Sequence, residues 1–167
     1  MVVTPLHYPV AYAVYRLSRR RLSLLGLVVG SMVPDLEVPI LYALYGPLRD
    51  RLVLHSILGG AFIVPAIGLA LFPIIELTIK RVLKVEAVSV RLSTYSLSLP
   101  IGGTTYVILD STQHEYNPLL WPLMSSSINA LVPFGNWHLS SLILHLLSFR
   151  LFIGIMDSIM RNKGRNI

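Results

Sequence analysis

The sequence of 167 residues contains no cysteine and few charged side chains. Without cysteine the chain can form neither a disulfide nor a thiolate metal site, so the redox compartment stays open. Only 13% of the residues are charged, whereas 54% are hydrophobic and the mean hydropathy is +0.68. This hydrophobic fraction is higher than that of a typical soluble domain of this size, and it predicts an integral membrane protein.

Long runs with little charge indicate where the chain could cross a bilayer, which takes about 20 apolar residues. Leu52–Ile75 contains no Lys, Arg, Asp or Glu, while Leu22–Tyr45 and Leu139–Met160 contain two such residues each. Leu92–Leu109 is a weaker candidate that is rich in Ser and Thr. We therefore predict one membrane-embedded domain over residues 1–167, an all-α helical bundle with about four spans.

The first 45 residues predict a short helical hairpin. His7–Leu17 is apolar, Ser18–Arg21 forms a polar turn, and the next helix should end near Pro34 because proline disfavours helix in the residue before it. The two helices have nearly equal lengths, so His7 should lie level with Asp35.

Glycine and proline predict further local features. Gly26 and Gly30 have the small-xxx-small spacing that lets two helices approach closely. Four helix-breaking residues within Asn117–Asn136 predict irregular structure there: Pro118, Pro122, Pro133 and Gly135.

The formal net charge of +6 predicts contact with anionic lipid headgroups and not with nucleic acid. The basic residues are not interleaved with aromatic ones, so we expect no binding of nucleic acid. The expected partner is the lipid bilayer of the cell membrane. By the positive-inside rule, the basic loop Lys80–Arg91 and the C-terminal tail should face the cytoplasm. A cleaved secretory signal is not expected.

Five ionisable residues stand in or beside apolar stretches, where each costs several kcal/mol if it is unpaired. A divalent cation would remove this cost at several positions at once, and imidazole with carboxylate suits a metal such as Zn²⁺. Two of the five are spaced i and i+4, so they should share one helix face. The predicted metal ligands are His7, Asp35, His55, Asp110 and His114.

Each of these residues also has a simpler interpretation. Asp35 could cap the helix that follows it, and Asp110 with His114 could form a plain hydrogen bond inside the bundle. A lone histidine on an apolar face is more often a satisfied core residue than a ligand. Glu37 is a weaker candidate, as an acceptor behind the ligands or a residue facing lipid headgroups.

Three further residues are candidates for supporting roles. Glu115 follows a predicted ligand and could act as a general base, as a partner of the ligands or as a surface acid. His138 could lie behind the ligands, and His145 is expected to be structural.

At these residues the sequence resembles the membrane-bound metal-dependent hydrolases called YdjM-like, and a related bacterial and archaeal family of unknown function. The motifs that carry the resemblance are Thr4-Pro5-Leu6-His7, Gly30-Ser31-Met32-Val33-Pro34-Asp35, His55-Ser56 and Asp110-Ser111-Thr112-Gln113-His114. The resemblance implies a helical fold distantly similar to zinc-dependent phospholipase C, the same five ligands, and hydrolysis of a phosphoester. Leu54 and Gln113 depart from the family pattern beside the ligands.

We therefore expect a membrane-bound metal-dependent hydrolase that acts on a phosphoester or lipid, with Asp35 or Glu115 moving the proton. The alternative is a non-enzymatic membrane protein whose buried polar cluster holds a structural or transported metal ion. The sequence indicates neither the oligomeric state nor the number of metal ions.

Overall fold

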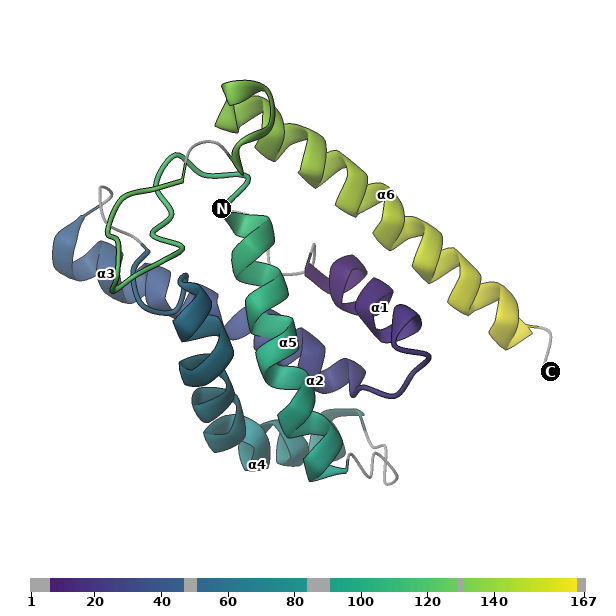
Figure 1. Ribbon diagram of the computed structural model, residues 1–167. Helices are drawn as coiled ribbons and strands as arrows, with labels where there is room; N and C mark the ends of the chain where they lie inside the picture. Colours follow the sequence, from purple (N-terminus) through teal and green to yellow (C-terminus); the bar gives the residue numbers. More distant parts are fainter. Residues whose placement is uncertain (1–6, 47–50, 84–90, 129–130, 165–167) are drawn as a thin grey trace.

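The computed structural model describes residues 7–46, 51–83, 91–128 and 131–164. Residues 4–6 of the N-terminal motif and 84–90 of the basic loop lie outside these ranges. The described residues form helices, turns and irregular segments but no strand, which confirms the predicted all-α class (Figure 1). In chain order the elements are α1 (Tyr8–Leu17), α2 (Leu24–Met32), η2 (Val33–Leu36), α3 (Glu37–Tyr45), η3 (Gly59–Ile63), α4 (Val64–Leu83), α5 (Leu92–Asp110), η5 (Pro133–Gly135) and α6 (Trp137–Gly164).

The predicted N-terminal hairpin is present. The Ser23 hydroxyl begins α2 by accepting the Gly26 backbone N–H at 3.2 Å, and α1 packs against α2. The α-helix ends at Met32, but the chain does not leave the helical path at Pro34. It passes through the 3-10 turn η2 into α3, so that Leu24–Tyr45 forms one long apolar segment.

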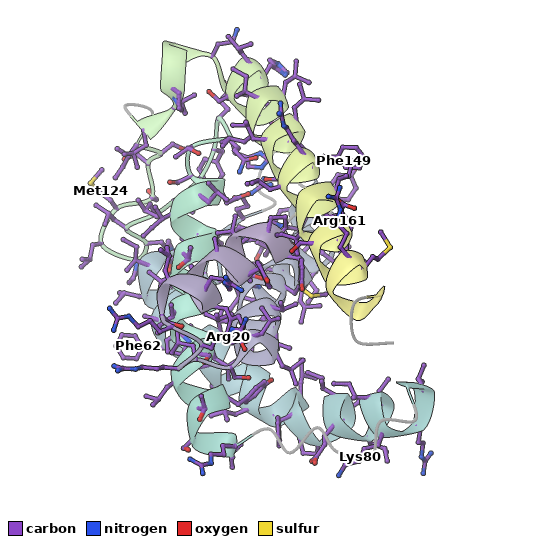
Figure 2. All side chains as sticks on the ribbon, turned by 90° about the vertical axis from the view of Figure 1, so that its right-hand side faces the viewer. Arg20, Phe62, Lys80, Met124, Phe149 and Arg161 are labelled. Carbon is purple, nitrogen blue, oxygen red and sulfur yellow. The ribbon has the colours of Figure 1, made fainter. Side chains whose placement is uncertain are left out.

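Three segments are long and apolar enough to cross a membrane: Leu24–Tyr45, Gly59–Val82 and Trp137–Ser158. This is one fewer than the four that the sequence predicts, because the predicted span in α5 does not meet that description. Of the most apolar windows of Gly59–Val82 and Trp137–Ser158, only 11% and 6% are buried inside the protein. Their apolar surfaces therefore suit contact with lipid, and Figure 2 shows Phe149 of α6 projecting away from the bundle.

Helix α5 lies in the middle of the bundle, between α2 and the η3–α4 segment (Figure 1). It contributes the fully buried Tyr95 and Leu99, which pack with Val29 of α2 and Val64 of α4. The Tyr95 hydroxyl donates to the Gly68 carbonyl at 3.0 Å, so this polar atom is satisfied inside the apolar core. The helix continues through Pro100 to Asp110.

Glycines allow α2 and α5 to approach at backbone distance. A Cβ atom at Gly30 would collide with the Leu99 carbonyl oxygen, and one at Gly102 would collide with the Leu27 carbonyl oxygen. The prediction that Gly26 and Gly30 serve close packing is therefore confirmed, since Gly26 likewise faces the Tyr95 backbone. The segment 117–128 is irregular as predicted, and so are residues 131–136 apart from η5.

We expect Gly30→Ala to destabilise the bundle by about 1–3 kcal/mol, because the added methyl group overpacks a backbone contact that cannot relax. Gly154→Ala is the matched control, since this helical glycine on α6 has open space around its Cβ position. There the substitution should be neutral or stabilise the helix by up to about 1 kcal/mol. Thermal unfolding of both variants in detergent measures the difference, and equal unfolding temperatures would contradict the close-packing assignment.

Candidate metal centre

Tyr106 of α5 is the centre of a cluster of buried polar side chains. Its hydroxyl donates to Asp35 Oδ1 at 2.6 Å and lies 3.4 Å from His55 Nε2. Its ring meets the His7 imidazole edge to face, with 4.5 Å between the ring centroids. Three of the five predicted ligands therefore lie around one tyrosine, which is itself only 3% exposed.

His7 and Asp35 approach each other as the hairpin predicts. His7 Nε2 lies 3.7 Å from Asp35 Oδ2, although the two residues begin α1 and follow α2, respectively. Asp35 does not cap α3: the N-cap position belongs to Leu36, which makes no side-chain capping bond. The capping interpretation of Asp35 is therefore wrong, and its carboxylate faces the cluster instead.

His55 is held in one orientation by Glu37. The imidazole Nδ1 lies 3.0 Å from Glu37 Oε2, and the same carboxylate accepts backbone N–H groups of Leu52, Val53 and Leu54 at 2.7–3.1 Å. Because a carboxylate can only accept, Nδ1 carries a proton, and in the neutral imidazole Nε2 is left with a lone pair. The Tyr106 hydroxyl already donates to Asp35, so this lone pair remains directed into the cluster.

Asp110 and His114 form a second part of the cluster. Asp110 Oδ1 lies 3.1 Å from His114 Nε2, and Oδ2 accepts hydrogen bonds from Arg51 Nε and Asn117 Nδ2, both at 3.0 Å. The i, i+4 spacing therefore brings the pair together on one face, as predicted. Burial raises the pKa of the Asp110 carboxyl, but the neighbouring His114 imidazole and Arg51 guanidinium outweigh it and hold the pKa well below its usual range.

Arg51 also lies beside His114, with 3.1 Å between Nη2 and Nε2. A guanidinium can only donate, so Nε2 would accept from Arg51 only when it carries no proton. The same nitrogen lies 3.1 Å from the buried Asp110 Oδ1, to which it donates when it is protonated. A proton on Nε2, or a metal cation in its place, would compensate the Asp110 carboxylate.

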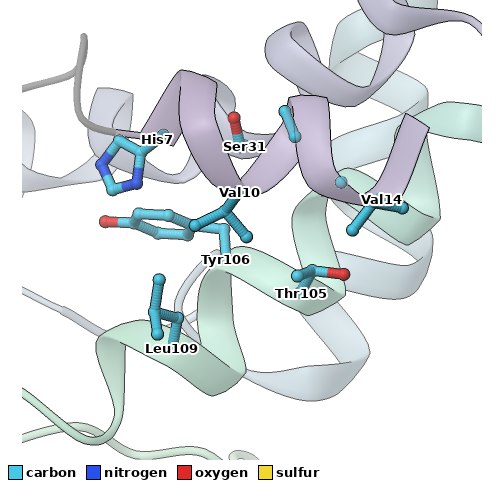
Figure 3. Close-up of a pocket in the computed structure, with 9 residues that line it drawn as sticks. His7, Val10, Val14, Ser31, Thr105, Tyr106 and Leu109 are labelled. Carbon is cyan, nitrogen blue, oxygen red and sulfur yellow. The ribbon is translucent and has the colours of Figure 1, made fainter. Parts of the chain in front are cut away.

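A small cavity adjoins the cluster between α1, α2 and α5 (Figure 3). Its volume is about 10 Å³, close to the least that holds one water molecule. His7 and Tyr106 line it together with Val10 and Val14 of α1 and Leu109 of α5, and Ser31 and Thr105 also line it in Figure 3. Of the five predicted ligands, His7 alone is among the residues that line this cavity.

The five predicted ligands are thus gathered in two neighbouring parts, one around Tyr106 and one around Arg51. Tyr106 and Asp110 join these parts, because they are four residues apart on α5. Among the described residues, however, no three His, Asp or Glu side chains form a group that could hold one ion. The metal site itself therefore stays a prediction.

The other candidates lie elsewhere or play supporting roles. Of the two residues predicted to move a proton, Glu115 is exposed to solvent, whereas the Asp35 side chain is only 17% exposed. His138 and His145 belong to α6, where His138 stacks on Trp137 and His145 Nδ1 lies 2.6 Å from the Ser141 carbonyl oxygen within its own helix. Leu54 and Gln113, the two departures from the family pattern, are both buried.

Sequence reasoning did not identify Tyr106, Arg51 or Asn117 as members of the cluster, and it ranked Glu37 too low. A signal for Tyr106 was present, because Gly102, Tyr106 and Asp110 recur at every fourth residue and so share one face of α5. Arg51 is a charge beside an apolar run, but nothing in its local sequence indicates its partners.

Comparison with known proteins gives a family without an assigned activity. The model of the family DUF4184, described as a domain of unknown function, matches residues 1–166. No curated protein and no solved structure matches the chain. The expected membership of a family of unknown function is confirmed, whereas no comparison links the chain to YdjM-like hydrolases or to phospholipase C. The chain belongs to the DUF4184 family.

Proposed function

We propose that this protein is a membrane-bound hydrolase that uses a divalent metal ion, most simply Zn²⁺, to cleave a phosphoester or lipid substrate. The observation that carries the proposal is the His55 side chain, whose Nε2 lone pair is directed into the cluster by the Glu37 carboxylate at 3.0 Å from Nδ1. A carboxylate behind a histidine is a common support of metal ligands, because it fixes the ring and raises its basicity.

The donor set suits the ion. Imidazole nitrogen and carboxylate oxygen are the ligands expected of Zn²⁺ in a chain without cysteine. The buried Asp110 Oδ1 and the neighbouring His114 Nε2 lie 3.1 Å apart, an oxygen and a nitrogen that a cation could share. The residues that would hold the metal are those of the predicted set: His7, Asp35, His55, Asp110 and His114. When bound, the metal would supply an acidified water molecule and polarise the scissile group.

Two carboxylates of the chain would move the proton that the water molecule releases. Asp35 is mostly enclosed and is oriented by the Tyr106 hydroxyl at 2.6 Å, so it is placed to accept a proton from water. Glu115 is exposed and would serve as the carrier that passes this proton to solvent. The cluster lies where α1 begins and where α2 and α5 end, so water would reach it from one end of the bundle. We place the protein in the cell membrane with its C-terminal tail in the cytoplasm.

The alternative of a non-enzymatic protein whose buried polar cluster is itself structural is favoured by one observation. Arg51 already places a positive charge 3.0 Å from Asp110, and both side chains are almost fully buried. Such a pair can satisfy the carboxylate without any metal. The two functions differ in what happens when this arginine is removed.

Arg51→Met should destabilise the metal-free protein by about 3–5 kcal/mol, since it leaves Asp110 buried without its cationic partner. If the cluster is a metal centre, addition of Zn²⁺ should restore much of the lost stability, because the ion compensates the same carboxylate. Thermal unfolding with and without Zn²⁺ measures this. A variant that Zn²⁺ does not stabilise, beside a wild type that it also leaves unchanged, would favour the arginine as the permanent partner of Asp110.

Metal content tests the ligand assignment directly. We expect detergent-purified protein to contain metal, and replacement of both Asp110 and His114 by Ala should abolish it, because this pair shares one helix face. His145→Ala is the control, since His145 bonds within α6 and its loss should leave the metal content unchanged. A double variant that keeps full metal occupancy would contradict the role of the pair. A wild-type protein that never binds metal would exclude the site.

Glu37→Gln tests the support of His55. The amide offers only one acceptor oxygen, so it cannot both fix the imidazole and accept the three backbone N–H groups. Metal affinity, measured by competition with a chelator, should fall by about 10–100-fold. Glu76→Gln changes an exposed carboxylate that pairs with Lys80 on α4, and it should have no effect. An unchanged affinity in the Glu37 variant would show that His55 does not depend on this carboxylate.

A further inference from the structure

We propose that the apolar groove between the α2–α3 segment and α4 binds the acyl chain of a bilayer lipid, and that this lipid is the substrate. The second half of this statement rests on the proposed function. The first half, lipid binding in the groove, stands on the shape and lining of the groove itself.

The groove is large and almost wholly apolar. Its volume is about 890 Å³, within the usual range for ligand sites of about 300–1,000 Å³. One wall comes from the α2–α3 segment and the other from α4, where every fourth residue faces the groove. The residues that define its two walls include Val28, Met32 and Leu36 on one side and Leu71, Ile75 and Ile79 on the other.

The length of the groove suits an acyl chain. From Leu71 to Ile79 the helix rises by about 12 Å, at about 1.5 Å per residue. One leaflet of a bilayer has a hydrocarbon thickness of about 15 Å, half of the usual 30 Å. A chain lying along α4 would therefore be covered over most of its depth in the leaflet.

Both walls belong to segments that are apolar and long enough to cross a membrane, Leu24–Tyr45 and Gly59–Val82. A groove between two such segments opens sideways, toward the hydrocarbon, where lipid chains are the molecules present at the highest concentration. Its exposed wall residues include Met32, Leu36 and Tyr42, which are 40–57% exposed. The tyrosine hydroxyl and one carboxylate are the polar groups of this lining.

That carboxylate is Asp35, and it connects the groove with the candidate metal centre. It lines the groove, while its Oδ1 accepts the Tyr106 hydroxyl and its Oδ2 lies 3.7 Å from His7. A lipid with its chain between α2 and α4 would therefore bring its polar end to the cluster. An anionic phosphate beside the Asp35 carboxylate needs a cation to compensate the two negative charges. In the proposed function the metal ion is that cation.

The experiment uses full-length protein in vesicles of phosphatidylethanolamine and phosphatidylglycerol that contain a phospholipid with a photoreactive acyl chain. Cross-linked residues are identified by mass spectrometry. Two adjacent isoleucines on α4 give a matched pair of variants: Ile75→Trp fills the groove, whereas Ile74→Trp changes a side chain that is 62% exposed and does not line it. Leu71→Trp serves as a second groove variant if the first does not fold.

We expect cross-links in the wild type to concentrate on the groove residues of α2 and α4. They should fall about tenfold in Ile75→Trp, a loss of about 1.4 kcal/mol in binding, and stay unchanged in Ile74→Trp. Cross-links spread evenly over α4 and α6, or equal in the two variants, would overturn lipid binding. So would protein–protein cross-links from the groove, which would assign it to a second copy of this chain.

Hydrolysis assays separate the groove from the proposed function. The groove variants should lose cleavage of the vesicle phospholipid but keep cleavage of a water-soluble phosphodiester, which needs no acyl-chain site. Specific cross-links in the groove without hydrolysis of either compound would leave lipid binding supported and overturn the substrate assignment with the proposed function. Cleavage of the soluble compound without cross-links in the groove would overturn the lipid site alone.

Discussion

The close contact between α2 and α5 is the constraint on which the candidate site depends. Gly30 and Gly102 let the two backbones touch, and each stands shortly before a residue of the cluster. Asp35 follows Gly30 by five residues and Tyr106 follows Gly102 by four, so the register of this contact decides whether the two side chains meet. Their hydrogen bond of 2.6 Å joins residues that are 71 positions apart. The glycine contact that packs α2 against α5 therefore also determines where the Asp35 carboxylate lies.

A second carboxylate organises the opposite side of the site. Glu37 accepts three consecutive backbone N–H groups, from Leu52 to Leu54, and thereby fixes a segment that has no regular secondary structure. The residues at the two ends of this segment, Arg51 and His55, both reach the cluster. Burying Glu37 is costly, yet the four hydrogen-bonding partners offset that cost and position two functional side chains at once.

The features that the sequence predicted are those that local spacing determines. Apolar runs predicted the helices, and the equal lengths of the two hairpin helices predicted that His7 lies near Asp35. The i, i+4 spacing predicted that Asp110 contacts His114. The helical period of α5 places Tyr106 on one face with Asp110, but the hydrogen-bonding partners of Tyr106 and Arg51 are 51–71 residues away in the chain, at separations that no periodicity encodes. The span expected in α5 is not among the three candidate spans of the described residues. Its Ser and Gly residues suit contact with other helices, and eight residues along this helix are buried in the bundle.

The exposed apolar faces and the buried ionic cluster have one physical origin. Helices α4 and α6 direct apolar side chains outward, as the most apolar windows of these segments, only 11% and 6% buried, show. The charged groups that such a chain must keep are then left to pair with one another inside, near the helix ends. Asp35 is where these two regions meet, since it lines the apolar groove and also bonds within the cluster. Chemistry at this position would act on a molecule that is itself apolar along its chain and polar at one end, and a bilayer lipid has this form.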